Sequence, residues 1–176
     1  AAPDRLLAVH YTSWDRTDTD ATVLLAEDGP TVLGRFTKED ASVDGQVWGL
    51  HFDKEKGAKA TLPDGRVLDA PANFGRAKNI RATLGERTFT FLNESSTNWI
   101  VEDEQGSKIA QFSGGGNGVR KAILEFEGET DLPVEDVAGL SWLARMVLES
   151  RLGRSSLVLI GTLAAMSVIA ILAFIF

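Results

Sequence analysis

Residues 133–153 read PVEDVAGLSWLARMVLESRLG, and this stretch has the period and the end signals of one helix. Pro133 suits a first helical turn, and Gly153 follows the last turn. Apolar side chains gather on one broad face of the expected helix: Val137, Leu140, Leu143, Ala144, Val147 and Leu148. Arg145 and Glu149 stand on the opposite face at the i,i+4 spacing of an ion pair. We therefore predict an amphipathic helix that packs on or inside the rest of the domain.

Short β-rich runs divided by turn signals precede this helix. Trp48, Leu50 and Phe52 fall on one face of their run, which is the alternation of a half-buried strand. The candidate strands are Leu6–Tyr11, Ala21–Ala26, Thr31–Phe36, Gln46–Phe52, Ala58–Leu62, Arg66–Asp69, Ile80–Leu84, Arg87–Leu92, Trp99–Glu102, Lys108–Phe112 and Arg120–Glu127. About 10–12 short strands at this spacing predict a mainly β fold, an antiparallel β-barrel or sandwich rather than a parallel sheet.

A continuous apolar stretch follows the helix, from Leu157 to Phe176, and reads LVLIGTLAAMSVIAILAFIF. It contains no charge, Asn, Gln or Pro, and as a helix it is about 30 Å long, the thickness of a bilayer's hydrocarbon core. Its Leu, Ile, Val and Phe residues supply about −4 to −7 kcal/mol of insertion free energy. We predict a single transmembrane helix; the alternative is a helix buried in a soluble core.

The predicted organisation has three parts. Residues 1–152 form a soluble β domain that includes the packed helix over 133–152. Residues 153–156 form a short linker, and residues 157–176 form the transmembrane helix. The chain starts without the apolar core of a signal peptide, so we expect that an initiator Met was lost before Ala1.

Charges beside the apolar stretch predict its orientation. Arg145, Arg151 and Arg154 precede it, and no charged side chain follows it. The positive-inside rule then places the globular domain on the cytoplasmic side of the plasma (inner) membrane, as a single-pass, tail-anchored protein. Trp142 flanks the apolar face of the preceding helix, and its indole belongs either to the core or to the headgroup region, where indoles settle well.

Small residues recur at every third position of the apolar stretch: Gly161, Ala164, Ser167, Ala170 and Ala173. On a helix of 3.6 residues per turn this spacing forms a winding ridge. Closely packed membrane helices use such small residues at their contacts. We predict that the ridge packs against other integral membrane subunits; the alternative is that small residues are simply common in membrane spans.

Composition and motifs argue against catalysis. The chain has no cysteine, which excludes disulfides, thiol nucleophiles and cysteine-bound metals. Its net charge of −7 disfavours non-specific binding to nucleic acid and to anionic lipid headgroups. His10 and His51 show no metal-ligand spacing, and no Gly-x-Ser-x-Gly turn is present to activate a serine. We expect no catalytic residue, cofactor or metal.

Residues 98–148 carry a family resemblance. A strand, the turn Glu104-Gln105-Gly106, a second strand, a glycine-rich loop and a third strand lead to Asp131-Leu132-Pro133, which opens the helix. This order resembles the tubby-like superfamily, which includes the LURP-one-related and phospholipid-scramblase-like domains. The resemblance implies a closed β-barrel around a central hydrophobic helix, and binding to membranes or phosphoinositides. Two apolar helices compete here for the barrel centre, and we favour residues 133–148.

The phosphoinositide-binding members of that superfamily use a cluster of Lys and Arg, and no such cluster is evident in this sequence. We therefore expect a non-catalytic accessory subunit of a larger membrane-protein complex, such as a bacterial respiratory assembly. The alternative is a lipid-binding or scramblase-like membrane protein, and a hydrolase or transferase comes third. Arg outnumbers Lys and Ala, Gly, Val and Asp are abundant, which is typical of a high-GC bacterium.

Overall fold

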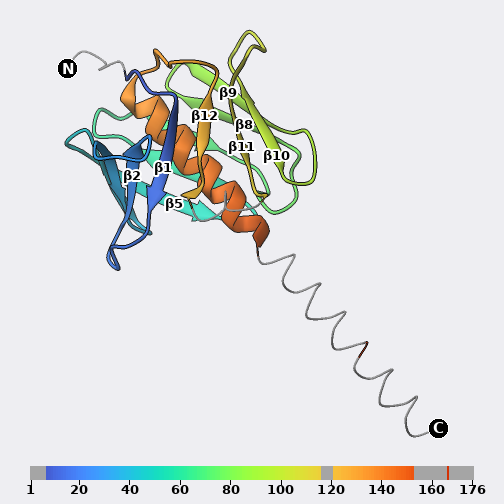
Figure 1. Ribbon diagram of the computed structural model, residues 1–176, viewed down its shortest axis with the longest axis horizontal. Helices are drawn as coiled ribbons and strands as arrows, with labels where there is room; N and C mark the ends of the chain where they lie inside the picture. Colours follow the sequence, from blue (N-terminus) through green and yellow to red (C-terminus); the bar gives the residue numbers. More distant parts are fainter. Residues whose placement is uncertain (1–6, 116–120, 153–165, 167–176) are drawn as a thin grey trace, which may run out of the picture.

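The computed structural model describes residues 7–115, 121–152 and 166. In this part of the chain twelve antiparallel strands close into a barrel, and one helix runs through it (Figure 1). The strands are β1 (Tyr11–Asp15), β2 (Thr22–Ala26), β3 (Val32–Phe36), β4 (Asp40–Val43), β5 (Gln46–Asp53), β6 (Gly57–Thr61), β7 (Val67–Ala70), β8 (Asn79–Leu84), β9 (Arg87–Asn93), β10 (Asn98–Glu102), β11 (Lys108–Ser113) and β12 (Leu124–Phe126). The predicted barrel or sandwich is thus a closed barrel.

The barrel is a simple meander in which each strand pairs with its neighbours in sequence. The first and last strands close it, with Tyr11 opposite Glu125 and Thr12 opposite Leu124. Because every connection is a hairpin, the loops gather alternately at two ends. The loops after β2, β4, β6, β8 and β10 lie at the end where the helix begins, which we name the entry end. Those after β1, β3, β5, β7 and β9 lie at the other end, the exit end.

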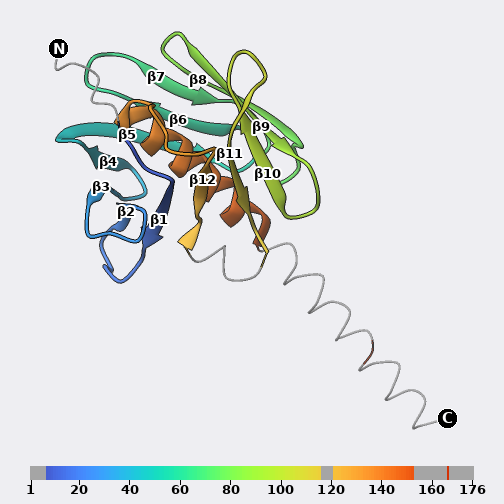
Figure 2. The same cartoon turned by 45° about the horizontal axis from the view of Figure 1, so that its top comes forward.

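The helix occupies the centre of the barrel from residue 134 to residue 152 (Figures 1 and 2). Its side chains are buried on every side up to Leu148, except for the half-buried Arg145. The predicted amphipathic pattern is therefore wrong in one respect: the face opposite the apolar one is also largely buried, and Glu135 and Asp136 are only 6% and 1% exposed. A barrel of twelve strands encloses more space than its own side chains fill, so a central helix is needed there.

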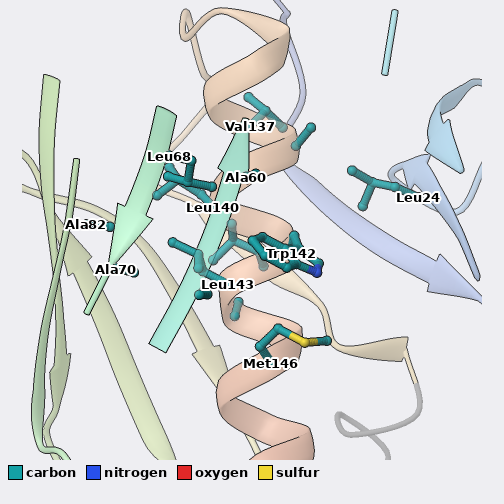
Figure 3. Packing of buried hydrophobic residues seen from close by; sticks show 14 of the residues in the cluster. Leu24, Ala60, Leu68, Ala70, Ala82, Val137, Leu140, Trp142, Leu143 and Met146 are labelled. Atoms are coloured by element: carbon teal, nitrogen blue, oxygen red, sulfur yellow. The ribbon is translucent and has the colours of Figure 1, made fainter. Parts of the chain in front are cut away.

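Small residues on the barrel wall make room for the helix. Figure 3 shows Leu140 and Leu143 beside Leu68 of β7, with alanines on the neighbouring strands. The buried alanines of the strands are Ala41, Ala58, Ala60, Ala70, Ala82 and Ala110. Gly139 of the helix faces the same wall, because an added Cβ would lie 3.1 Å from Leu68 Cδ2. Close packing of helix and wall accounts for the single continuous core.

Large aromatic residues fill the rest of the interior. Trp14 packs edge-to-face on Phe36 at 4.9 Å between ring centroids, and Trp99 stacks on Phe112 at 5.9 Å. The predicted alternation in β5 is confirmed, since Trp48 and Leu50 are buried; Phe52 is only partly buried. Such ring pairs add about 0.5–1.5 kcal/mol each beyond area burial.

Three strands differ from the sequence prediction. β4 (Asp40–Val43) was not predicted, β1 lies at Tyr11–Asp15 instead of Leu6–Tyr11, and β12 is shorter than predicted. In β4 only Ala41 and Val43 face the core, so its apolar pattern is too weak to stand out. In β1 one of the buried residues is a threonine, where strand patterns usually have an apolar residue. Thr12 Oγ1 lies 2.7 Å from Ser141 Oγ of the helix.

No helix among the described residues is both long and apolar enough to cross a bilayer. The predicted span Leu157–Phe176 lies outside the described residues except for Met166, and the predicted linker over 153–156 lies outside them entirely.

Truncating the centre of the helix should destabilise the whole barrel. Leu143 is fully buried, so Leu143→Ala should lower the free energy of unfolding by about 2–5 kcal/mol through lost burial and a residual cavity. Leu152 lies on the same helix but is 45% exposed, so Leu152→Ala should change it by less than about 0.5 kcal/mol. Denaturant unfolding of the full chain, followed by tryptophan fluorescence, measures both. Equal effects of the two substitutions would contradict a helix enclosed by the barrel.

Candidate functional site

The exit end of the barrel is where the helix leaves it toward the predicted membrane span. The loops there include residues 16–21, 37–39, 54–56, 71–78 and 94–97. Polar contacts join three of these loops to the helix or to one another, and a groove opens between two of them. We therefore take this end as the candidate functional site.

Arg151 fixes the end of the helix to the loop between β7 and β8. Its Nε donates to the carbonyl oxygen of Phe74 at 3.2 Å, and its Nη2 donates to the carbonyl oxygen of Ala77. The guanidinium also lies 4.6 Å from the ring centroid of Trp99, a cation–π distance. The helix end and this loop are thus held as one unit.

Arg145 performs a similar role one and a half turns earlier. Its Nε donates to Glu149 Oε1 at 2.8 Å, and Arg16 Nη2 donates to the same oxygen at 2.8 Å. Its guanidinium lies 4.8 Å from the ring centroid of Trp14. This network joins the helix to the loop after β1. These ion pairs are partly solvated, so each contributes about 1 kcal/mol or less to the free energy of unfolding. Their main effect is to hold the helix and the loop in a fixed position.

The loops after β5 and after β7 are in direct contact. The backbone N–H of Phe74 donates to the carbonyl oxygen of Lys54 at 2.9 Å. Gly57 permits this approach, because its φ is +125° and an added Cβ would lie 2.3 Å from the Ala70 carbonyl oxygen. Asp53 orders the first loop by accepting from the backbone N–H groups of Glu55 and Lys56, at 2.9 and 3.1 Å.

This contact brings together four exposed cations, Lys54, Lys56, Arg76 and Lys78, which we name the exit-end cation cluster. The cluster was not predicted from the sequence, because its members come from two segments that are separated by β6 and β7. The only signal in the sequence was two pairs of basic residues, Lys54 with Lys56 and Arg76 with Lys78, whose separation along the chain is consistent with successive hairpins. Among residues 54–56 and 71–78, Glu55 is the single carboxylate.

A groove of about 620 Å³ lies on the other side of the helix end, between the loops after β1 and after β3. Its apolar lining comes from Phe36, Leu50, Phe52, Trp142 and Met146. Asp18, Asp20, Lys38 and Glu39 are among its polar lining residues. The volume of the groove lies in the range of small-ligand sites. Residues of both positive and negative charge line its rim.

Asp18, one of the carboxylates that line the groove, is occupied by local contacts. Asp18 Oδ1 accepts from the backbone N–H of Asp20 at 2.9 Å, and its other oxygen pairs with Arg35. The backbone hydrogen bond, helped by the charge of Arg35, lowers the pKa of Asp18 below its ordinary value. These contacts order the loop after β1 and leave little free acceptor capacity for a ligand.

The residues predicted to act at the membrane fall into two groups. Arg145 and Arg151, the predicted determinants of topology, are half-buried and bound to the barrel as described. Trp142 is 3% exposed and borders the groove, so it belongs to the core and does not present its indole at a headgroup-facing surface. The remaining predicted residues lie outside the described part of the chain: Arg154, Gly161, Ala164, Ser167, Ala170 and Ala173.

The entry end holds the two buried carboxylates of the helix. Glu135 Oε1 lies 3.3 Å from Arg66 Nη2, and Asp136 Oδ2 lies 3.0 Å from Arg87 Nε. Both arginines come from barrel hairpins, so the pairs connect the start of the helix to the wall. A buried carboxylate at the start of a helix is also stabilised by the helix dipole. We assign these pairs to helix placement.

Both histidines are exposed, and His51 is one of the residues that line the groove. His10 is exposed and its Nδ1 lies 3.2 Å from Glu27 Oε1, while His51 is exposed on the outer face of β5. Within residues 7–115, 121–152 and 166, no three His, Asp or Glu side chains are placed to hold a metal ion.

No family model, no curated protein and no solved structure matches this chain. The tubby-like resemblance therefore stays a prediction, and the argument for function rests on the geometry.

Removing Arg151 should loosen the exit end. Arg151→Met retains much of the apolar stem but loses two hydrogen bonds and the contact with Trp99, so we expect a loss of about 2 kcal/mol in unfolding free energy. Arg76→Met, at an exposed position of the adjacent loop, should cost less than about 0.5 kcal/mol. Amide hydrogen exchange in residues 71–78 should accelerate for the first variant alone. Unchanged exchange would refute the fixing role.

Acid should weaken the loop after β5 through Asp53. Hydrogen bonds from the backbone N–H groups of Glu55 and Lys56 lower the pKa of Asp53 below its ordinary value of 3.8. The carboxylate therefore stabilises the fold fully above that value, and the contribution is lost as the pH falls through the lowered pKa. Asp53→Asn keeps an acceptor oxygen but no titration, so its unfolding free energy should fall less steeply below pH 3.8. Superimposable pH profiles for the variant and the parent chain would contradict this assignment.

Proposed function

We propose that this protein is a membrane-anchored, non-catalytic accessory subunit of a larger membrane-protein complex. One observation carries the proposal: the helix that fills the barrel is followed, after only residues 153–156, by the apolar stretch Leu157–Phe176. A barrel filled by such a helix has a packed interior, and only residues 153–156 separate it from the apolar stretch. In this proposal it covers the cytoplasmic face of its complex.

The filled interior supports a structural role over a carrier role. The described helix is buried along almost its whole length, and its apolar side chains contact the barrel wall directly (Figure 3). A lipid or other ligand in the barrel centre would have to displace this helix and its packing free energy. Carrier barrels keep an internal cavity for their ligand instead.

The apolar stretch supplies the contact with partner subunits in this proposal. The small residues Gly161, Ala164, Ser167, Ala170 and Ala173 form its packing ridge, and Arg154 with Arg145 and Arg151 favours a cytoplasmic barrel in the plasma membrane. In this proposal the host is a membrane assembly of the kind of a bacterial respiratory complex.

Purification of the tagged full chain in mild detergent, with mass spectrometry of the co-purifying proteins, tests the proposal. A stoichiometric set of membrane proteins is expected with the native chain. The set should be lost when residues 157–176 are replaced by polyleucine, and reduced by Gly161→Leu with Ala164→Leu. Leu163→Ile is the matched control on the same stretch, since it keeps volume and polarity. A chain that purifies alone from native membranes would refute the subunit role.

The groove at the exit end favours a second candidate, lipid binding. Trp142, Met146 and Phe52 give it an apolar lining close to the predicted membrane surface. In this alternative an acyl chain enters the groove and the barrel centre remains closed. Met146→Lys should then abolish co-purification of phospholipid with the full chain, while Val47→Lys, on an exposed outer position of β5, should not. Equal lipid content in both variants would exclude the groove.

A further inference from the structure

The exit-end cation cluster has a fixed position relative to the helix end. Arg151 donates to the carbonyl oxygens of Phe74 and Ala77, which belong to the loop that carries Arg76 and Lys78. The hydrogen bond from Phe74 to Lys54 adds the neighbouring loop, with Lys54 and Lys56. The loops that carry the four cations are thus held beside the helix end by the Arg151 side chain and by the backbone hydrogen bond between the two loops.

The tether to the apolar stretch is too short to move the cluster far from the membrane. Five peptide steps separate residue 152 from Leu157, and a fully extended chain spans at most about 3.6 Å per residue, or about 18 Å in total. This limit holds for any conformation of residues 153–156. Where the stretch is inserted, as the proposed function requires, the loops around the helix end lie close to the headgroup layer.

Charge is distributed unevenly over the two ends of the barrel. The entry-end connections, residues 27–31, 44–45, 62–66, 85–86, 103–107 and 127–131, carry ten carboxylates and one cation, Arg66. The exit-end loops at residues 16–21, 37–39, 54–56, 71–78 and 94–97 carry six cations and five carboxylates, and four of these cations lie with one carboxylate in residues 54–56 and 71–78. An anionic surface therefore attracts the exit-end cation cluster and repels the entry end, within a Debye length of about 8 Å at physiological salt.

We propose that the exit-end cation cluster binds the phosphate groups of anionic lipid headgroups beside the span, and so holds the barrel upright on the membrane. The inference rests on the proposed membrane anchor and adds the lipid as a specific partner. Lys and Arg residues next to a membrane are attracted by the negative potential of the cytoplasmic leaflet, and four of them act together here. The negative charge of Glu55 offsets one of the four positive charges.

The absence of cysteine allows a site-specific probe in the full chain. A fluorophore on Asn79→Cys, an exposed position next to Lys78, reports on the cluster; one on Gln105→Cys, exposed in the turn after β10, reports on the entry end. Each labelled chain is reconstituted into phosphatidylcholine vesicles with or without phosphatidylglycerol. A nitroxide on the lipid headgroups quenches the fluorophore in proportion to their proximity.

We expect phosphatidylglycerol to increase quenching at Asn79→Cys severalfold, and to leave quenching at Gln105→Cys low. The increase should disappear at about 1 M salt, where the Debye length is about 3 Å. Lys56→Gln with Lys78→Gln should remove most of it. Lys108→Gln with Lys121→Gln is the matched control with the same change in net charge, because these lysines pair with Glu127 and Asp28 away from the cluster.

The outcomes separate this inference from the anchor itself. A chain that does not remain with either kind of vesicle would refute both the anchor and the lipid contact. A chain that inserts but is quenched equally in both lipids, or equally in the cluster variant and its control, would refute the lipid contact alone. Quenching that arises only when native membrane proteins are present would also overturn it, since the cluster would then bind a protein surface.

Discussion

The structure depends on burial of the central helix inside a closed barrel. Twelve strands leave a lumen that strand side chains alone do not fill, and an empty apolar lumen would forfeit both packing and hydrophobic free energy. Leu140 and Leu143 fill that space against the alanines of β6, β7 and β8. The barrel in turn supplies Arg66 and Arg87 as charge partners for the two buried carboxylates at the start of the helix. Helix and barrel are therefore interdependent.

The same constraint orients the molecule. Because the helix must run through the barrel from one end to the other, the chain after residue 152 starts at the exit end. Arg151 then fixes that point to the loop after β7, and Arg145 with Glu149 fixes it to the loop after β1. The contacts that complete the core thus also decide which loops lie nearest the apolar stretch. Stability and the placement of the functional end share one set of contacts.

Much of the fold is predictable from the sequence because it follows local periodicity. The alternation of Trp48 and Leu50 and the helix after Pro133 are local patterns, and both are confirmed. β1 was misplaced because its inward position is a threonine, and Thr12 is acceptable there only through its contact with Ser141, 129 residues away. The burial of Glu135 and Asp136 was not predicted for the same reason: their arginine partners come from distant hairpins. The cation cluster was missed because it exists only after β6 and β7 pair. These errors concern polar residues whose environment is set by non-local contacts.

The barrel around a helix agrees with the fold that the tubby-like resemblance implied, but a shared architecture does not by itself transfer a function. The function must follow from the surfaces of the folded chain. The net charge of the whole chain does not describe the charge of each surface. A net charge of −7 predicts repulsion from an anionic membrane. Folding places ten carboxylates in the entry-end connections and gathers four cations beside the helix end, so the exit-end cation cluster, which lies near the predicted span, has the opposite sign. Electrostatic attraction decays over a few ångströms to a nanometre, and the sign of the nearest surface therefore outweighs the total charge.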